Sequence, residues 1–338
     1  MRKYLFYPGC SLERNASAYY DSVMALREPL GIEFEEIEDW NCCGATEYTS
    51  LHRLGSFALQ GRNLALAAKQ VAGGNNVLAA PCSACYLNLS KAEHYLRGDE
   101  HLAAQVNEAL ATGGLSYRPG TIDVRHMLDI LLNDIGLEEI RAKVVKPLTG
   151  LRVAAYYGCF VIRPDYEHRF SSPEYPTVLE DLLEVLGAEV VEYPAKAHCC
   201  SGHMPSISAP SAYELIRRLI AMAVEKKAHT IVTLCPMCQL NLDAYQADMN
   251  RFFGTKYRMP ILYFTQLIGL AFGKAPEELG FGKELVDARP ALKKIGVKMV
   301  HPAEETGGTA PAAPKPRKKE EGLPMPKMPA KHQNEEVS

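Results

Sequence analysis

The ten cysteines of this 338-residue chain fall into two copies of one pattern, with none left over. Each copy begins with a single cysteine, continues with an adjacent pair and ends with a Cys-x-x-Cys pair. The copies consist of Cys10, Cys42, Cys43, Cys82 and Cys85, and of Cys159, Cys199, Cys200, Cys235 and Cys238. The gaps are 31 and 38 residues in the first copy and 39 and 34 in the second. The pattern requires a fold that gathers five thiols twice, and we interpret it as two metal centres.

The duplication extends to the residues around the cysteines. Residues 7–10 (Tyr-Pro-Gly-Cys) correspond to residues 157–159 (Tyr-Gly-Cys). Residues 30–33 (Leu-Gly-Ile-Glu) likewise correspond to residues 186–189 (Leu-Gly-Ala-Glu). Self-similarity of this kind indicates an internal repeat.

Each repeat alternates short apolar strands with longer helices, which predicts an α/β fold with a mainly parallel sheet flanked by helices. Strands are expected near residues 4–7, 33–37, 77–80 and 122–124, and near 153–156, 189–192, 230–233 and 261–263. Helices of the first repeat are expected at residues 16–30, 51–71, 84–96 and 126–135. Because the cysteines mostly follow strands, we expect them at the carboxyl ends of the strands, where open α/β sheets form their sites.

The expected domains are residues 1–147, residues 148–285 and a C-terminal extension at 286–338. From about residue 301 the extension is rich in proline, carries the basic segment 315–319 and has few large apolar residues. Such a segment buries too little apolar surface to fold alone, so we expect disorder there. Docking onto a partner is the alternative interpretation.

Charge and hydropathy limit the function classes. The net charge of −3 does not indicate a nucleic-acid-binding protein. The longest apolar segments, such as residues 261–272, are shorter than the roughly 20 residues of a membrane helix, and the N-terminus does not resemble a signal peptide. We therefore expect a cytoplasmic protein without direct membrane insertion, in which clustered cysteines serve as metal ligands or redox groups rather than structural disulfides.

The number of thiols in each copy distinguishes between metals. A structural zinc site takes four ligands, and a fifth thiolate would add a negative charge that is costly to bury. An iron–sulfur cluster spreads this charge over several irons and sulfides, and thiolates are its usual ligands. Iron–sulfur ligation is the leading interpretation, while a zinc site and a dithiol redox relay are the alternatives.

At residues 1–285 the doubled pattern resembles the cysteine-rich CCG-domain family, which includes the B subunit of heterodisulfide reductase. The resemblance implies one noncubane 4Fe-4S cluster in each repeat, bound by the five cysteines of that repeat, with a disulfide substrate between the two clusters. It also implies an oxidoreductase that acts on sulfur groups as the catalytic subunit of a larger complex. Each of the two clusters would then supply one of the two electrons that cleave the disulfide.

The chain contains neither a bacterial-type ferredoxin motif nor a Gly-x-Gly-x-x-Gly dinucleotide motif. Electrons must therefore come from, or pass to, another polypeptide. The resemblance implies two such partners in the complex, a ferredoxin-like C subunit together with a flavin-containing A subunit. The small-molecule partner would be a thiol or disulfide.

The second copy departs from the family pattern. It reads Cys199-Cys200-Ser201-Gly202, whereas the first reads Cys42-Cys43-Gly44, so a serine precedes the glycine expected to let the loop turn. His198 and His203 flank this second pair. We interpret both histidines as hydrogen-bond donors to sulfur, with direct ligation as the alternative.

Two arginines also follow the repeat, because Arg14 and Arg163 each lie four residues after the first cysteine of a copy. We interpret them as groups that bind an anionic thiol substrate or offset cluster charge, with a surface salt bridge as the alternative. At the level of function, the alternatives to a disulfide reductase are a non-catalytic electron-transfer subunit of another CCG-domain oxidoreductase and a zinc-stabilised interaction protein.

Overall fold

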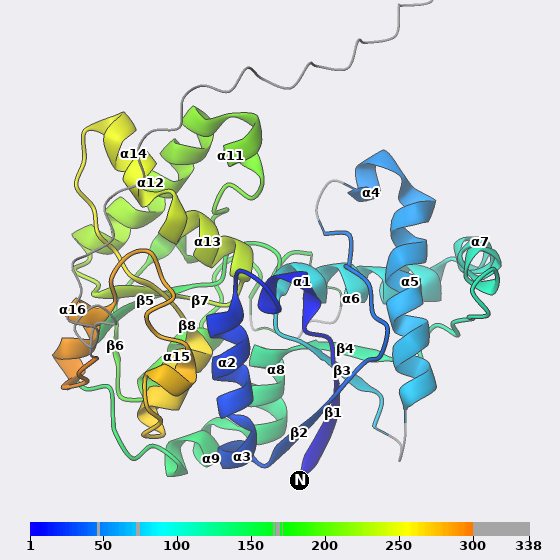
Figure 1. Cartoon of the computed structure of the whole chain (residues 1–338), viewed down its shortest axis with the longest axis horizontal. Helices are drawn as coiled ribbons and strands as arrows, with labels where there is room; N and C mark the ends of the chain where they lie inside the picture. Colours follow the sequence, from blue (N-terminus) through cyan, green and yellow to red (C-terminus); the bar gives the residue numbers. More distant parts are fainter. Residues whose placement is uncertain (46–47, 72–74, 165, 167–169, 171, 300–338) are drawn as a thin grey trace, which may run out of the picture. The chain divides into compact units, whose positions relative to one another are not determined.

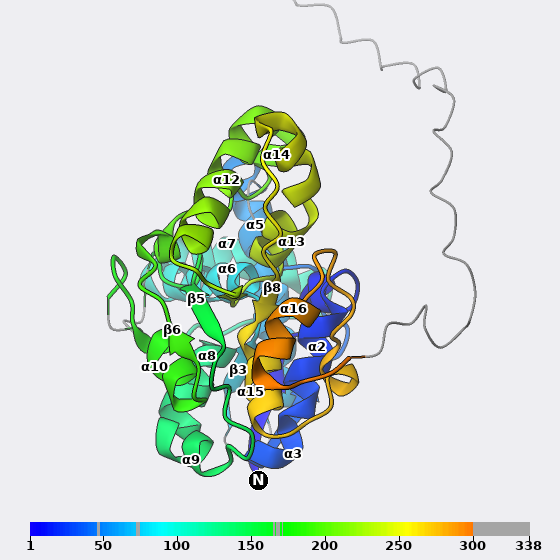
Figure 2. The same ribbon diagram turned by 90° about the vertical axis from the view of Figure 1, so that its left-hand side faces the viewer.

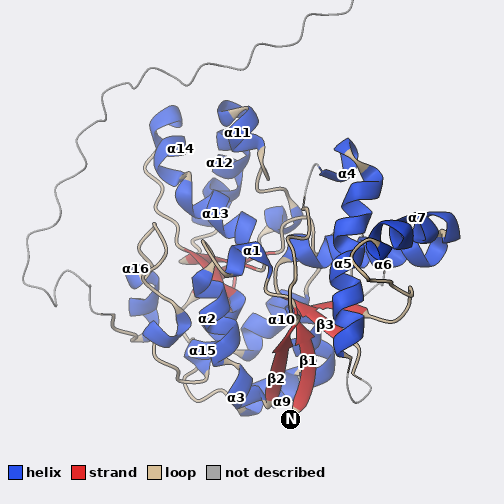
Figure 3. Cartoon of the chain, turned by 45° about the vertical axis from the view of Figure 1, so that its right-hand side comes forward, coloured by secondary structure: helices blue, strands red, loops and turns tan. Residues whose placement is uncertain are grey.

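Two parallel sheets form the core of the chain, one in each repeat (Figure 1, Figure 3). The computed structural model describes residues 1–45, 48–71, 75–164, 166, 170 and 172–299. Within these residues the first sheet has the strand order β2-β1-β3-β4 and the second has the order β6-β5-β7-β8, and all neighbouring strands are parallel. The strands are β1 (Arg2–Phe6), β2 (Ile32–Glu36), β3 (Val77–Ala80), β4 (Asp123–His126), β5 (Arg152–Tyr156), β6 (Glu189–Val190), β7 (Thr230–Thr233) and β8 (Ile261–Tyr263). The predicted α/β fold with duplicated parallel sheets is confirmed.

The central strands are short apolar segments with helices packed around them. Strand β7 is buried at all four positions and β3 at three of four. Parallel strands that are covered by helices on both faces do not alternate apolar with charged residues, as the strands of a half-exposed sheet do. Accordingly, β3 (Val-Leu-Ala-Ala) and β7 (Thr-Ile-Val-Thr) contain no charged residue. The two sheets thereby hold the carboxyl ends of β3 and β7 rigidly inside the molecule.

The helices of the first repeat follow its strands closely. They are α1 (Gly9–Leu12), α2 (Ser17–Ala25), α3 (Arg27–Leu30), α4 (Tyr48–Leu51), α5 (Arg53–Gln70), α6 (Ser83–Gly98), α7 (Glu100–Ala111), α8 (Met127–Ile130) with its π-helical continuation η1 (Leu131–Ile135), and α9 (Leu137–Ala142). The helix predicted at residues 16–30 is divided at Leu26. Pro29 explains the division, because its ring would clash with the carbonyl of Ala25 and it has no N–H to bond to that carbonyl.

Helix α7 occupies a segment for which no element was predicted. It begins at Asp99, whose carboxylate accepts a hydrogen bond from the backbone N–H of Leu102 at 2.9 Å. An aspartate cap followed by apolar residues at helical spacing is a signal that the sequence carries.

The second repeat has the same plan with a different set of helices. They are α10 (Val178–Val185), η2 (Pro194–Ala197), α11 (Met204–Ile207), α12 (Ala209–Glu225), α13 (Pro236–Ala244), α14 (Gln246–Phe253), α15 (Phe264–Ala271), η3 (Glu277–Leu279), α16 (Arg289–Leu292) and η4 (Lys293–Ile295). Helices α6 and α13 occupy equivalent places, each directly after the third strand in sequence of its repeat.

The two repeats interlock through helices that belong to opposite halves of the sequence. Helix α2 of the first repeat lies beside α15 of the second in both views (Figure 1, Figure 2). The hydroxyls of Ser22 and Thr265 form a buried hydrogen bond of 2.7 Å between these helices. Residues 1–298 accordingly form one compact unit that contains both repeats. The domain boundaries at residues 147 and 285 stay a prediction, and the predicted disorder from residue 301 falls outside the described residues.

Candidate metal centres

The five cysteines of the first repeat come from three separate turns that meet at the carboxyl ends of the strands. Cys10 lies in α1, Cys42 and Cys43 lie in the loop after β2, and Cys82 caps the N-terminus of α6 with Cys85 in the first turn of that helix. The sulfur atoms of Cys10 and Cys42 are 3.8 Å apart, and those of Cys43 and Cys85 are 3.5 Å apart.

The second set converges in the same way. All five of its cysteines line one small hollow, together with Ser83 of the first repeat. The hollow measures about 20 Å³, because the thiols contact one another across it. A larger adjoining hollow of about 440 Å³ shares Cys159 and Cys199, so this set is open on one side.

The two sets adjoin at the seam between the repeats, where Ser83 lines the hollow of the second set and donates to the carbonyl of Leu234. Cys82 and Cys235 each follow the third strand in sequence of their repeat. The pKa of Cys82 is raised chiefly by the neighbouring thiol of Cys235, and that of Cys235 is lowered by the thiols of Cys238 and Cys82. Both side chains are buried. The duplicated pattern therefore produces two adjoining sites rather than two remote ones.

A glycine before the first cysteine of each set makes room for the last. Gly9 has φ +70°, and a Cβ atom there would lie 2.8 Å from the sulfur of Cys85. Gly158 has φ +69°, and its Cβ would lie 2.9 Å from the sulfur of Cys238. Both the positive φ and the close approach of a sulfur atom require glycine.

A tyrosine ties the first turn of each set to the second. The hydroxyl of Tyr7 donates to the carbonyl of Asn41, and that of Tyr156 donates to the carbonyl of His198. Each carbonyl belongs to the residue directly before an adjacent cysteine pair. The equivalent of Tyr7 is thus Tyr156, so the predicted correspondence with Tyr157 is wrong by one residue. The hydroxyl of Tyr157 binds Glu180 and the backbone of α10 instead.

Two asparagines that sequence reasoning missed bind the cysteine pairs. Asn88 donates to the carbonyl of Cys43 at 3.2 Å and to its sulfur at 3.9 Å. Asn241 donates to the carbonyl of Cys200 at 3.2 Å, to its sulfur at 3.6 Å and to the carbonyl of Gly202 at 2.7 Å. The available signal was the repeated spacing Cys-x-x-Cys-x-x-Asn, which places the asparagine and the preceding cysteine one turn apart on α6 and α13.

The loops stabilise a sulfur anion at the first cysteine of each pair. The pKa of Cys42 is lowered to about 2, because the thiols of Cys10 and Cys43 and the backbone N–H groups of Gly44 and Ala45 donate to its sulfur. The same arrangement lowers the pKa of Cys199 to about 2, through the thiols of Cys159 and Cys200 and the N–H of Ser201. The donating thiols show the reverse effect. The pKa values of Cys43 and Cys200 are both raised to about 12, chiefly by donation to Cys42 and Cys199.

Ser201 occupies the place of Gly44 rather than preceding it as an insertion. Both residues directly follow the second cysteine of a pair, and both have positive φ, +85° for Ser201 and +64° for Gly44. The second loop therefore has the same turn as the first, although a left-handed backbone conformation is strained for serine. The hydroxyl of Ser201 lies 3.5 Å from Nδ2 of Asn241.

The arginines predicted as a pair have different surroundings. Arg163 donates through Nη2 to the carbonyl of Ala197, two residues before Cys199, and its Nη1 lies 3.8 Å from a carboxylate oxygen of Glu174. It lines the 440 Å³ hollow together with Arg218. Arg14 is exposed beyond the end of α1. Arg163 thus contacts a cysteine-bearing loop directly.

The two histidines flanking the second pair are exposed. The side chain of His198 lines the same hollow as Arg163, and His203 caps the N-terminus of the short helix α11. The hydrogen bond described for the sulfur of Cys200 comes from Asn241. The roles predicted for His198 and His203 as donors to sulfur stay predictions.

The donor set fits an iron–sulfur group. Each site offers five soft sulfur ligands, backbone and amide N–H donors directed at sulfur, and a glycine that admits the last thiol. Such donors stabilise the negative charge of cluster-bound thiolates. In the described part of the chain, no group of three or more cysteine, histidine, aspartate or glutamate side chains has the spacing of a ready single-ion site.

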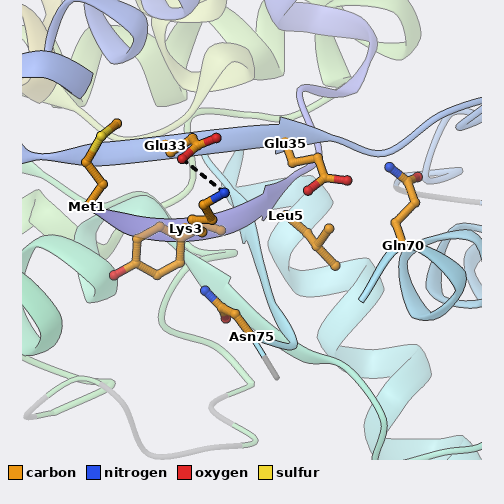
Figure 4. Close-up of a pocket in the computed structure, with 8 residues that line it drawn as sticks. Met1, Lys3, Leu5, Glu33, Glu35, Gln70 and Asn75 are labelled. Atoms are coloured by element: carbon orange, nitrogen blue, oxygen red, sulfur yellow. Dashed lines mark ion pairs between the residues drawn. The ribbon is translucent and has the colours of Figure 1, made fainter. Parts of the chain in front are cut away.

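A separate hollow of about 450 Å³ lies on the first sheet, away from the cysteines (Figure 4). Its walls carry Lys3 and Glu33, which pair with each other at 3.4 Å. None of the cysteines lines this hollow.

Comparison with known proteins agrees with this geometry. A family model for the cysteine-rich CCG domain matches the chain twice, at residues 4–90 and 153–243. The 8-methylmenaquinol:fumarate reductase membrane anchor subunit of Wolinella succinogenes is 37% identical over 287 residues, which cover 85% of this chain and 98% of that protein. The B subunit of the ferredoxin:CoB-CoM heterodisulfide reductase of Methanosarcina mazei is 30% identical over 298 residues, which cover 87% of this chain and 97% of that protein.

A solved structure shares the fold. The crystal structure of a hypothetical protein from Helicobacter pylori aligns with a TM-score of 0.66 and 12% identity, covering 85% of this chain and 52% of that one. At this identity the likeness concerns the fold alone. Among the described residues, none of the helices combines the length and apolar composition needed to span a membrane.

Proposed function

The chain belongs to the family of cysteine-rich CCG-domain proteins, and we propose that it is the iron–sulfur subunit of a heterodisulfide-reductase-like complex. In this role it reduces a disulfide, or oxidises two thiols, by one-electron steps. Each five-cysteine set would hold one noncubane 4Fe-4S cluster. The relatives named as B or B-like subunits of heterodisulfide reductase, which align over nearly their whole length, support this proposal.

The observation that carries the proposal is that Cys82 and Cys235 adjoin, because the residues directly before them share the hydroxyl of Tyr19 and Ser83 lines the hollow of the second set. Cleavage of a disulfide takes two electrons, and each bound cluster would supply one. Two sites that adjoin through their ligands can serve the same bond, whereas remote sites would require an electron to cross the protein between the two halves of the reaction.

The burial of the cysteines gives each site a closed side and an open side. Cys43, Cys85, Cys200 and Cys238 are buried, while Cys10, Cys42 and Cys199 are exposed and Cys159 is half-buried. The buried thiols would hold the group against the sheet. The open side leaves room for a small substrate or for a redox partner.

Arg163 is the residue best placed to hold an anionic end of the substrate. It lines the hollow beside Cys159 and Cys199 and is anchored by the carbonyl of Ala197. A guanidinium group matches a carboxylate, phosphate or sulfonate in two hydrogen bonds. Arg14, whose side chain is exposed beyond the end of α1, would have the same role in the first repeat with a weaker hold on the substrate.

The proposed partners are a ferredoxin-like C subunit together with a flavin-containing A subunit, in a cytoplasmic complex. The chain has no sequence motif for a flavin or for a ferredoxin-type cluster, so electrons must cross a protein interface. The open side of each cysteine set is the place where such transfer would occur.

A second candidate is an electron-transfer subunit that passes electrons to another reductase without binding a sulfur substrate. The 37% identity with a fumarate reductase subunit favours it. In this case the clusters would be the same, but the hollow beside Arg163 would bind a partner protein instead of a small thiol.

The test begins with anaerobic reconstitution of the full chain with iron and sulfide. Two noncubane clusters correspond to about eight irons per chain. The holoprotein is then titrated with low-molecular-weight thiols of different anionic end groups under an oxidising mediator, and the EPR spectrum is recorded. A signal that depends on the thiol supports the disulfide reductase. Two loaded clusters whose spectra respond to no thiol would refute it and favour the electron-transfer subunit.

A further inference from the structure

A single hydroxyl group joins the two cysteine-bearing turns at the seam. The hydroxyl of Tyr19, on α2, shares its single proton between the carbonyl of Pro81 at 3.0 Å and the carbonyl of Leu234 at 3.3 Å. Pro81 directly precedes Cys82, and Leu234 directly precedes Cys235. One phenol thus binds equivalent backbone atoms of both repeats, directly before Cys82 and Cys235.

The position of Tyr19 is determined by the second repeat, although Tyr19 belongs to the first. Its ring stacks on Tyr263 with a centroid distance of 4.3 Å and an angle of 4° between the ring planes. It also meets Phe264 edge-on at 6.2 Å. The hydrogen bond between the hydroxyls of Ser22 and Thr265 holds the next turn of α2 against α15, the helix that begins at Phe264. Tyr19 is fully buried, so it has no freedom to adopt another rotamer.

Ser83 makes a second, one-sided connection. Its hydroxyl donates to the carbonyl of Leu234 at 3.2 Å and lies 3.5 Å from Nε2 of His126. Pro236 occupies the equivalent position of the second repeat and has no hydroxyl. The carbonyl of Leu234 therefore accepts from the hydroxyls of Tyr19 and Ser83, and that of Pro81 accepts from Tyr19. The buried imidazole of His126 also faces both carbonyls.

We propose that Tyr19 and Ser83 are positioning residues that fix the separation of the two cysteine sets. Tyr19 holds both cysteine-bearing turns, and Ser83 holds the second turn against the first repeat. The inference rests on the proposed function, because a fixed separation matters for two clusters that act on the same disulfide. A site of this kind works only when its supporting residues hold the reacting groups to a fraction of an ångström.

The test uses Tyr19→Phe, which keeps the stacked ring and removes the hydroxyl. In the holoprotein we expect unchanged iron content, a measurable change in the spin–spin interaction between the two clusters in EPR, and a loss of disulfide turnover of about tenfold or more. Tyr193→Phe is the matched control, because its buried hydroxyl also donates to a carbonyl, that of Leu219 at 3.0 Å, away from the seam. Equal cluster interaction in wild type, Tyr19→Phe and Tyr193→Phe would overturn the inference.

A second measurement, on the metal-free chain, separates this inference from the proposed function. The first turns of α6 and α13 are marked by the amides of Tyr86 and Gln239, which donate to the carbonyls of Cys82 and Cys235. Tyr19→Phe should accelerate hydrogen exchange at both turns, and Ser83→Ala at the second turn alone. Exchange that is unchanged in both variants, or changed equally by Tyr193→Phe, contradicts the positioning role. If wild type binds no clusters, the proposed function fails while this exchange pattern still decides the inference.

Discussion

Cys82 and Cys235, one residue from each repeat, adjoin at the seam, because the hydroxyl of Tyr19 binds the carbonyls of the residues directly before them. In the metal-free chain the two thiols should be trapped as a covalent link. Oxidation by diamide removes two electrons and two protons from a thiol pair, and we expect a Cys82–Cys235 disulfide as the leading link between the repeats. Peptide mapping by mass spectrometry identifies it. Finding only links within a repeat would show that the two sets do not adjoin.

The close approach of Gly9 to Cys85 predicts a site-specific loss of iron. In Gly9→Ala the new Cβ would meet the sulfur at 2.8 Å, so we expect the first cluster to be lost and the iron content to fall by about half. Gly31→Ala is the control, because Gly31 has a similar φ of +61° but nothing within 4 Å of its Cβ position. Both variants should lose about 1–2 kcal/mol of stability from the left-handed backbone, and only Gly9→Ala should lose iron. Equal iron in the two variants would contradict the proposed first site.

The hydrogen bond from Asn241 to Cys200 predicts a change in reduction potential. A donor to a cluster-bound sulfur stabilises the reduced, more negative state, so its removal in Asn241→Ala should lower the potential of the second cluster. One hydrogen bond of about 1 kcal/mol corresponds to about 40 mV for a one-electron couple. EPR-monitored redox titration measures the shift, with Asn250→Ala, whose amide binds the carbonyl of Tyr257 outside the site, as control. A potential that does not move, or moves equally in the control, speaks against this role.

The left-handed serine of the second loop predicts a stabilising substitution. Ser201 has φ +85°, and Ser201→Gly relieves a strain of about 1 kcal/mol while giving up a hydrogen bond of 3.5 Å. Urea unfolding of the metal-free chain should therefore show equal or higher stability. Ser208→Gly is the comparison, because Ser208 has φ −145° at the N-terminus of α12 and gains nothing from glycine. A clear destabilisation by Ser201→Gly would show that its hydroxyl outweighs the strain.

The unequal placement of the two arginines predicts unequal effects of substitution. Arg163→Gln removes the bond to the carbonyl of Ala197 and a positive charge from the hollow beside Cys159, so we expect a higher KM for an anionic thiol substrate, by about tenfold. Arg14→Gln should have a smaller effect, since its side chain is exposed. Iron content should stay unchanged in both. A loss of iron in Arg163→Gln would instead assign this residue to the stability of the loop.

Much of the site follows from local patterns. The Cys-x-x-Cys pairs were placed correctly because each directly follows a buried strand, and a parallel sheet brings the carboxyl ends of its strands together. The chain order of the elements could also be predicted, although Pro29 divides one helix and α7 was missed. The match of Tyr7 with Tyr157 failed because the second repeat has two adjacent tyrosines. The spacing to the following cysteine separates them, since Tyr7 and Tyr156 each lie three positions before it, and the hydrogen bonds of the two hydroxyls agree.

The duplicated spacing of ten cysteines, by itself, determined that five thiols gather twice on a parallel α/β fold, since local strand and turn preferences place them. Only the tertiary structure decided that the two sets adjoin at Cys82 and Cys235 and that Tyr19 binds both turns. These contacts accompany the packing of α2 against α15, two helices from opposite halves of the sequence. Packing between distant segments leaves no spacing signal in the sequence, because the contact depends on how whole elements fit rather than on neighbouring residues.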